Sequence, residues 1–428
     1  MHPVISLPAA SSSEHLLALD EVSHFSKTDM GQPGAGPWTF RILPEPFLSA
    51  ELERVACPKS SRKVDSLTFQ PCSPYVHRNQ DRLVVEEWSF PGGTWQFNSV
   101  LDGHVNHYTV DYVAQSLPKK IKESLSAALR ESGSRQIPPS RVTQILRDTV
   151  VQLDNSISAN LLDIFPRDLR RLGKLTDRDV QSAFQQDSTG RNRAAAARCL
   201  GGTTLVLSLT DPNERNVWVA NLGDCHAVMG LRHRNGGWSG TLINQLHAGH
   251  NPREVQRIRA EHGREADCVT NGRVLGFLEP TRAMGDAWLK LPSLYTSRIF
   301  SNLDQDWISQ ENLRRCAARI STPPYVSNIP DVFHREMIPN RPWFLILSSD
   351  GLSSTEIYTG MDNMVRAWTQ CVGHTLDARP PTVYAALSLL RAAIGGQDER
   401  KVSRNLTVEM EERWMDDISI LIQRSFHH

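Results

Sequence analysis

Several short apolar segments of this chain end or begin at an aspartate that stands beside a turn-forming residue. They are residues 95–101 before Asp102-Gly103-His104, residues 343–347 before Ser349-Asp350-Gly351, and residues 418–422 after Asp416-Asp417. Apolar runs of this length predict β-strands. Carboxylates at strand ends are held rigidly and face a cleft, as hard cations such as Mg²⁺ or Mn²⁺ require of oxygen ligands. A single Asp-Gly pair more often marks a simple turn, so only the whole set indicates a metal site.

Three more apolar runs lie close together in the middle of the chain. They cover residues 203–209, 216–221 and 226–231, with turn-forming residues between them. We predict antiparallel hairpins here, because a parallel crossover needs about a dozen residues or more. Apolar positions three and four apart in residues 119–132 and 140–164 predict helices packed on a sheet. The Arg- and Ala-rich stretch 187–198 is predicted to be a loop.

Charge and composition narrow the class of protein. Of the 428 residues, 39% are hydrophobic and 22% are charged, a mixture typical of folded globular proteins. Lys plus Arg equals Asp plus Glu at 47 each, so no overall field attracts nucleic acid or an anionic membrane. The seven cysteines are scattered and form no CxxC pair, which argues against a disulfide scaffold or a zinc ribbon. We expect an intracellular protein that binds no nucleic acid.

The distribution of apolar residues predicts a soluble chain with one main domain. No apolar run approaches the ~20 residues of a membrane span. The N-terminal part has no basic segment and no arginine before Arg41, so neither a secretory signal nor a typical transit peptide is visible. Residues 1–40 are expected to be an extended or flexible segment, and residues 41–428 a single domain. The Pro-rich stretch 291–331 is expected to be an insertion in that domain.

Six strings of this sequence, taken in order, resemble the successive signatures of the type 2C, metal-dependent (PPM) protein phosphatases. They are VLDGH (100–104), GGTTLVLSL (201–209), VANLGDCHAVMG (219–230), EPTRAMGD (279–286), FLILSSDG (344–351) and DDISILI (416–422). Each string is weak alone, whereas six in the family's order are specific. Residues 250–263 and the TPPY string at 322–325 resemble the pyruvate dehydrogenase phosphatase branch of this family.

The resemblance implies both a fold and a reaction. The fold is α+β, a four-layer αββα sandwich of two antiparallel sheets flanked by helices. The reaction is the hydrolysis of phosphoserine and phosphothreonine in proteins by a bridging water that two Mg²⁺ or Mn²⁺ ions activate. The implied partner is a phosphoprotein substrate, and a monomer is the default. The compartment is the cytoplasm, the nucleus or, through the pyruvate dehydrogenase phosphatase resemblance alone, the mitochondrial matrix.

The resemblance also assigns the site residue by residue. The metal ligands that it implies are Asp81, Asp102, the backbone carbonyl of Gly103, Asp350 and Asp416. His104 is implied as the general acid that protonates the leaving serine or threonine oxygen; the alternative is a histidine that merely packs behind the turn. Asp224 and Asp286 match aspartates of the family's GD motifs. We expect Asp224 to support a turn, and Asp286 to support the metal ligands from behind or to support a loop.

The chain departs from the family pattern at several positions beside the site. Gln80 stands where members often have Glu, and Val105 and Asn106 replace flexible residues beside the site. Arg198 and Ser354 stand where many members add acidic ligands, which argues against a third metal ion. These departures motivate a second hypothesis, a catalytically weak or silent phosphatase fold that serves as a binding or regulatory module. The presence of all four carboxylates of the two-metal core favours the enzyme.

Overall fold

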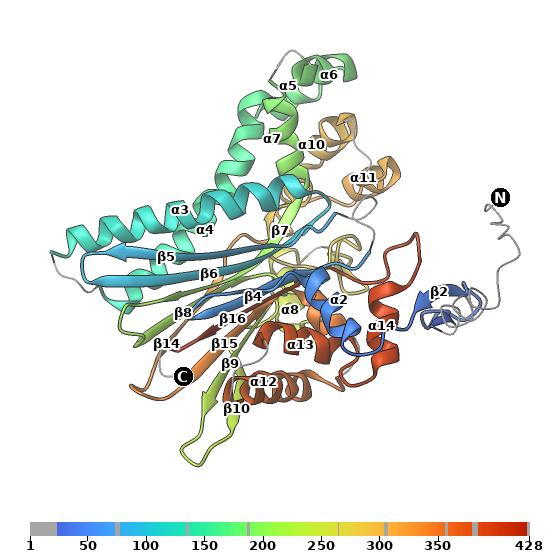
Figure 1. Cartoon of the computed structure of the whole chain (residues 1–428). Helices are drawn as coiled ribbons and strands as arrows, with labels where there is room; N and C mark the ends of the chain where they lie inside the picture. Colours follow the sequence, from blue (N-terminus) through green and yellow to red (C-terminus); the bar gives the residue numbers. More distant parts are fainter. Residues whose placement is uncertain are drawn as a thin grey trace, which may run out of the picture.

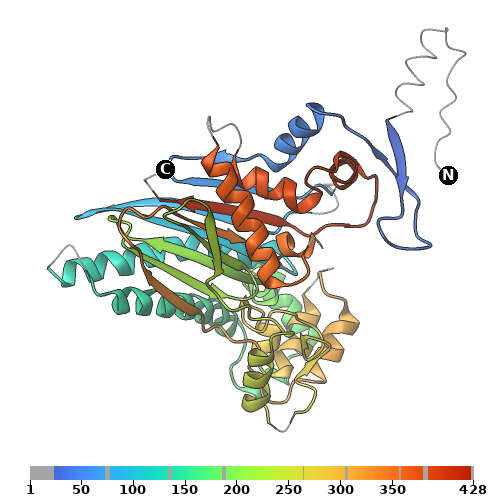
Figure 2. The same cartoon turned by 90° about the horizontal axis from the view of Figure 1, so that it is seen from below.

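Two β-sheets pack face to face, and helices cover the outer face of each sheet (Figure 1, Figure 2). The computed structural model describes residues 24–72, 78–133, 137–185, 189–263, 265–303, 307–355, 358–378 and 384–425. Neighbouring strands in both sheets run antiparallel. The predicted αββα sandwich is therefore confirmed.

Each sheet has six strands, and we call them sheet one and sheet two. Sheet one has the order β14-β8-β7-β6-β5, with β13 added beside β7, and sheet two has the order β10-β9-β15-β16-β4-β3. The strands of sheet one are β5 (Arg82–Phe90), β6 (Gly93–His104), β7 (Gly202–Thr210), β8 (Asn216–Leu222), β13 (Met284–Gly285) and β14 (Asp331–Glu336). The strands of sheet two are β3 (Lys59–Ser60), β4 (Val64–Phe69), β9 (His226–Arg232), β10 (Trp238–Leu242), β15 (Trp343–Ser348) and β16 (Ile418–Arg424).

Long amphipathic helices form the two outer layers. Helices α3 (His107–Glu131) and α4 (Pro139–Ile164) cover sheet one, whereas α2 (Phe47–Ala56), α12 (Met361–Asp377) and α13 (Ala385–Ile394) cover sheet two. The other helices are α5 (Leu169–Leu172), α6 (Asp177–Gln185), α7 (Arg191–Leu200), α8 (Pro252–Glu261), α9 (Ala287–Lys290), α10 (Ser293–Arg298), α11 (Gln310–Ala317) and α14 (Glu399–Thr407). Two short 3₁₀ helices, η1 (Phe300–Asn302) and η2 (Asp350–Thr355), and the pair β11 (Val269–Thr270) and β12 (Arg273–Val274) complete the list.

Three apolar layers hold the sandwich together, and they explain why its central strands are apolar at nearly every position. In β7, Leu205 and Leu207 pack against the helices on sheet one, while Val206 between them packs between the two sheets. In β15, Phe344 faces the helices on sheet two and Leu345 faces the inter-sheet layer. Side chains alternate between the faces of a strand, and both faces are covered here.

Two local predictions are wrong. The segment 226–231 does not form a hairpin with 216–221, because β8 belongs to sheet one whereas β9 pairs with β10 and β15 in sheet two. The turn at Gly223, whose φ of 117° suits glycine, carries the chain across from one sheet to the other. The stretch predicted as the loop 187–198 is mostly helix α7, whose Ala195, Ala196 and Ala197 are buried; residues 187 and 188 lie outside the described residues.

The N-terminal segment is described from residue 24 onward. Strands β1 (Phe25–Thr28) and β2 (Trp38–Arg41) pair as an antiparallel hairpin, and β2 lies beside α14 (Figure 1). The predicted insertion 291–331 contains α10, η1 and α11.

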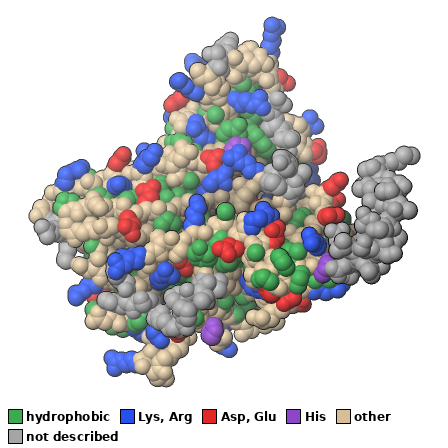
Figure 3. Space-filling view, viewed as in Figure 1, with side chains coloured by type: hydrophobic (Ala, Val, Ile, Leu, Met, Phe, Trp, Pro, Cys, Tyr) green, Lys and Arg blue, Asp and Glu red, His purple; other side chains and the backbone are tan. Residues whose placement is uncertain are grey.

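Within the described ranges, no helix has the length and apolar character that a membrane crossing demands. On the face in Figure 3, Lys and Arg side chains lie interspersed with Asp and Glu.

Candidate active site

Strand register brings the predicted acidic residues to one end of the sandwich. The start of β5 pairs with the end of β6, with Arg82 opposite Leu101. Asp81 and Asp102 therefore lie at the same end of these two neighbouring strands. In sheet two, the end of β15 pairs with the start of β16, which places Asp350 and Asp416 together. An added Cβ on Gly351 would lie 3.4 Å from the Cβ of Asp416.

Asp81 and Ser349 connect the two sheets at this end. The Oγ of Ser349 donates to the Oδ2 of Asp81 at 2.7 Å and itself accepts from the backbone N of Ser419 at 2.9 Å. Asp81 is only 3% exposed, and its Oδ1 is buried without a hydrogen-bond partner. Burial, followed by the charges of Asp417 and Asp350, raises the pKa of Asp81 well above its ordinary value.

The remaining carboxylates are close enough to repel one another. Burial and then the charges of Asp81 and Asp350 raise the pKa of Asp102 well above its ordinary value. Burial and then Asp416 raise the pKa of Asp350. Burial and then Asp350 raise the pKa of Asp224 to about 8. Several acids that oppose each other's ionisation are typical of a site that gathers negative charge for a functional reason.

The residues fit a hard divalent cation by their chemistry. Among the residues that the structure describes, no group of three or more His, Cys, Asp or Glu side chains is arranged to hold a metal ion as it stands. All the candidate donors are nevertheless oxygens, the unpartnered Oδ1 of Asp81 is one of them, and a cation would neutralise the repulsion. The chemistry of these side chains therefore suits a hard divalent cation.

Gly103 and Asp416 contribute to this site in different ways. A Cβ at Gly103 would lie 2.7 Å from the carbonyl oxygen of Gln80, so only glycine allows this close approach of the two backbones. The Asp416 side chain is 55% exposed and pairs with Arg413 at 2.6 Å. Its neighbour Asp417 is buried and accepts from the backbone N of Gln80 at 2.7 Å. Asp417 therefore fixes the segment before Asp81, whereas Asp416 is the more accessible of the two.

His104 lies at the end of β6 and is held by Asp286. Its Nε2 lies 2.8 Å from the Oδ2 of Asp286, whose other oxygen accepts from Trp288 Nε1 at 3.2 Å. Asp286 is fully buried. Burial of His104 opposes its charge, but the Asp286 carboxylate outweighs that effect and raises the pKa of His104 above its ordinary value. With Nε2 bound to Asp286, the imidazole has its Nδ1 left to face a substrate.

Two residues beside the site have a larger role than the sequence indicated. Asp224 was expected to support a turn, yet it lies close enough to affect the ionisation of Asp102 and His104. Ser349 was not singled out, although it joins Asp81 to Asp417 and to Ser419 of β16. The available signals were the GD string, which places Asp224 itself after a strand, and the SSDG string, which places Ser349 beside Asp350.

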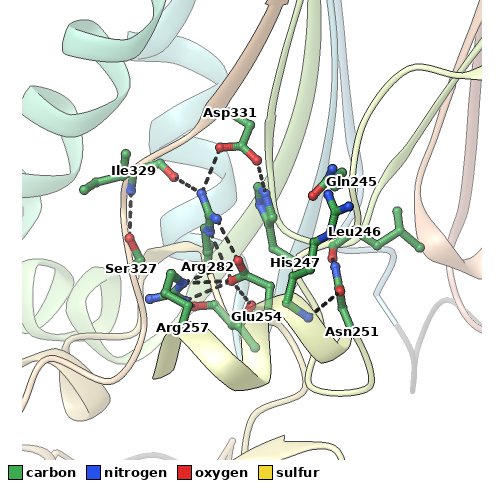
Figure 4. Close-up of polar contacts among 12 residues, drawn as sticks. Gln245, Leu246, His247, Asn251, Glu254, Arg257, Arg282, Ser327, Ile329 and Asp331 are labelled. Atoms are coloured by element: carbon green, nitrogen blue, oxygen red, sulfur yellow. Dashed lines mark hydrogen bonds and ion pairs between the residues drawn. The ribbon is translucent and has the colours of Figure 1, made fainter. Parts of the chain in front are cut away.

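A partly buried ionic network anchors the loop that precedes Asp286 (Figure 4). Arg282 contacts Glu254 of α8 at 2.7 Å and Asp331 of β14 at 3.1 Å. His247 contacts the other oxygen of Asp331 at 3.0 Å, and Arg257 contacts Glu254 at 2.9 Å. Because Arg282 is four residues before Asp286, this network fixes the chain that positions the partner of His104.

Comparisons with known proteins identify the family of this chain. The family model of protein phosphatase 2C matches residues 72–370. A protein phosphatase 2C homolog of Schizosaccharomyces pombe is 25% identical over 363 residues, which cover 80% of this chain and 76% of that protein. The mitochondrial [pyruvate dehydrogenase [acetyl-transferring]]-phosphatase 1 of Bos taurus is 29% identical over 244 residues, 49% of this chain. The matched region spans only 45% of the length of that bovine protein.

A solved structure supports the fold independently. The structure described as a C. elegans sex determining protein aligns with 86% of this chain and 65% of its own chain, at 18% identity and a TM-score of 0.50. That likeness bears on the fold alone. The family match covers more than half of this chain, and both curated relatives are phosphatases by name, which favours the enzyme over the binding-module alternative. This chain therefore belongs to the protein phosphatase 2C family of metal-dependent protein serine/threonine phosphatases.

Proposed function

We propose that this chain hydrolyses phosphoserine and phosphothreonine in proteins at the carboxylate site beside β6, β15 and β16. The observation that supports this site most directly is the closeness of its acids: after burial, the charges of Asp81, Asp350 and Asp416 all raise the pKa of Asp102. These residues come from distant parts of the sequence, and a site that collects oxygen ligands accounts for their convergence.

Four carboxylates and one carbonyl are the proposed metal ligands. They are Asp81, Asp102, Asp350, Asp416 and the backbone carbonyl of Gly103. Two Mg²⁺ or Mn²⁺ ions, when bound, would activate water and offset the charge of the phosphate oxygens. The positions that argue against a third ion offer no carboxylate here: Arg198 lies over the ring of Tyr112 at 4.8 Å, and Ser354 Oγ donates to the backbone oxygen of Asp350 at 3.2 Å.

His104 is the proposed proton donor to the leaving serine or threonine oxygen. Because Asp286 engages Nε2, the proton is delivered from Nδ1. Asp286 keeps the ring in one orientation, and its charge favours the protonated imidazole that a general acid needs. The leaving oxygen of a serine or threonine is strongly basic, so this proton transfer matters more for a phosphopeptide than for an aryl phosphate.

Manganese-dependent hydrolysis of a phosphothreonine peptide by the purified protein tests this proposal. Asp102→Asn and Asp350→Asn should abolish turnover and also remove the increase in melting temperature that Mn²⁺ gives to the wild-type protein. Asp163→Asn is the matched control, because that side chain is 71% exposed on α4. If wild-type protein is inactive with Mn²⁺ and Mg²⁺, or if the two site variants keep full activity, the proposed chemistry is wrong.

The substrate and compartment follow only from the relatives. The bovine relative is, by its name, a mitochondrial phosphatase that acts on pyruvate dehydrogenase, and this similarity supports a mitochondrial phosphoprotein as the substrate. A fluorescent fusion of the full chain tests the compartment. Exclusive cytosolic or nuclear fluorescence would contradict it. For the free protein we propose a monomer, which light scattering can check.

A further inference from the structure

A basic cavity lies between the N-terminal hairpin and helix α14, and none of its lining residues belongs to the carboxylate site. Its volume is about 420 Å³. Four cationic side chains line it, one from β1 and three from α14, with a single carboxylate: Lys27, Arg400, Lys401, Arg404 and Asp398. The volume is within the ~300–1,000 Å³ range of small-molecule sites.

The helix α14 concentrates positive charge on one side. Arg400 and Arg404 are four residues apart, a spacing at which like charges destabilise an isolated helix. Arg400 is held in place by Phe40 of β2, with its guanidinium carbon 5.6 Å from the ring centroid, and by a hydrogen bond to Ser26 of β1. The repulsion between Arg400 and Arg404 therefore acts where the hairpin contacts the helix.

The one carboxylate in the cavity is already engaged with the backbone. The Oδ1 of Asp398 caps α14 by accepting from the backbone N of Lys401 at 2.9 Å. The Nε of Arg404 is buried without a hydrogen-bond partner. Among the described residues, no carboxylate lies within ion-pair distance of Lys27, Lys401 or Arg404. A buried donor without a partner is costly, and an anion bound among these cationic side chains would offer acceptor oxygens to it.

We propose that this cavity binds a phosphate group, carried by a small phosphorylated molecule or present as free phosphate. Phosphate offers several acceptor oxygens and a charge near −2, which suits converging Arg and Lys donors. One such group would contact β1 and α14 together and would fasten the hairpin to the helix. Residues 408–415 connect the end of α14 at Thr407 to Asp416, which precedes β16, so ligand binding would stabilise a segment that runs on to the proposed catalytic site.

The test is a thermal-shift titration of the full-length protein with sodium phosphate and with glycerol phosphate at constant ionic strength. An excess of chelator removes divalent ions, so that the carboxylate site does not contribute and no turnover occurs. We expect a saturable rise in melting temperature for the wild-type protein, and an apparent affinity at least about tenfold weaker for the Lys401→Gln/Arg404→Gln variant. Tighter binding of glycerol phosphate than of phosphate identifies a phosphorylated small molecule, and the reverse order identifies free phosphate.

Control variants test whether phosphate binding depends on the charges of the cavity. Lys120→Gln/Lys122→Gln removes the same charge from exposed positions of α3 and should bind as wild type, as should Asp102→Asn. Lys27→Gln, at an exposed side chain of β1, should also weaken binding, which covers the case in which the double variant misfolds. The absence of a saturable shift in wild type, or equal binding by wild type and both cavity variants, would overturn the proposal. Because no turnover is measured, this result is independent of the phosphatase activity.

Discussion

Replacing Glu254 by Gln removes the central negative charge of the network in Figure 4 while keeping the shape of the side chain. The Glu254 side chain is 5% exposed and accepts from Arg282 at 2.7 Å, from Arg257 at 2.9 Å and from Thr281 Oγ1 at 2.7 Å. Burial opposes its charge, but hydrogen bonds from Arg282, Arg257 and Thr281 outweigh burial and hold the pKa of Glu254 well below its usual range. The carboxylate is therefore strongly favoured in the folded state.

The expected loss follows from what the substitution leaves behind. Removing one partner of a buried ion pair costs about 3–5 kcal/mol, because the other charge stays buried. The Arg282 side chain is 13% exposed but keeps Asp331 as a second partner at 3.1 Å, so we expect the lower end, about 3 kcal/mol. For 428 residues, an unfolding entropy of about 2.1 cal/mol/K per residue converts this loss into a melting temperature lower by about 3 °C.

Differential scanning calorimetry at pH 7 measures the effect, and hydrogen exchange of α8 locates it. Glu261→Gln is the matched control, since Glu261 also pairs with Arg257 at 2.9 Å but is 50% exposed. An exposed pair contributes less than about 1 kcal/mol, and this control should melt within about 1 °C of wild type. Equal melting temperatures for Glu254→Gln and Glu261→Gln would refute the reasoning, because burial would then have no bearing on the cost.

The pH dependence gives a second test of the same substitution. Glu254 has a folded-state pKa below its ordinary value of 4.5, so its contribution to stability is present above pH 4.5 and is lost as the pH falls below it. The difference between wild type and Glu254→Gln should therefore be constant between pH 6 and pH 8 and narrow below about pH 4.5. A difference that widens in acid would contradict the assignment.

Two further substitutions probe the surroundings of His104 and the buried end of β9. A Cβ at Gly202 would overlap both Asp286 Oδ2 and His104 Nε2, so Gly202→Ala should lower kcat for a phosphopeptide more than for an aryl phosphate, as steady-state kinetics with both substrates would measure. Burial lowers the pKa of His226 to about 4, so its stabilising contribution is present above pH 6.5 and is lost as the pH falls toward 4. Wild type should lose about 2 kcal/mol more stability than His226→Leu between pH 7 and pH 5, as denaturant melts would measure.

The sequence predicted the strands and the acidic residues that follow them, because both signals are local. Apolar runs bounded by turn residues identified β6, β15 and β16 without any knowledge of their partners. Whether β9 pairs within sheet one or sheet two depends on which sheet covers its apolar face. The local sequence carries no information on this choice. Helix α7 was missed because its polar N-terminal half reads as a loop, whereas the buried alanines after it show that packing decided the conformation.

The supporting contacts of the site could not be predicted for a related reason. Asp286 and His104 are 182 positions apart, and only the folded chain lets Arg282 bridge Glu254 of α8 and Asp331 of β14. Charged residues in a surface helix usually face solvent, so Glu254 gave no sign of burial. The family resemblance assigned the positions of the proposed ligands, but only the folded chain shows what holds them in place.

The turn after β6 shows how one departure from the family pattern is accommodated. Val105 has a φ of 70°, a left-handed conformation that costs a β-branched residue on the order of 1–2 kcal/mol. The next residue, Asn106, is 1% exposed; it caps α3 by accepting from the backbone N of Tyr108 at 2.9 Å and donates to the carbonyl of Ala197 in α7 at 2.9 Å. An N-cap of this kind contributes about 1 kcal/mol, and the buried bond to Ala197 adds a similar amount. These two contacts offset the strain at Val105 and fix the turn, so His104 is presented from a rigid backbone although no glycine follows it.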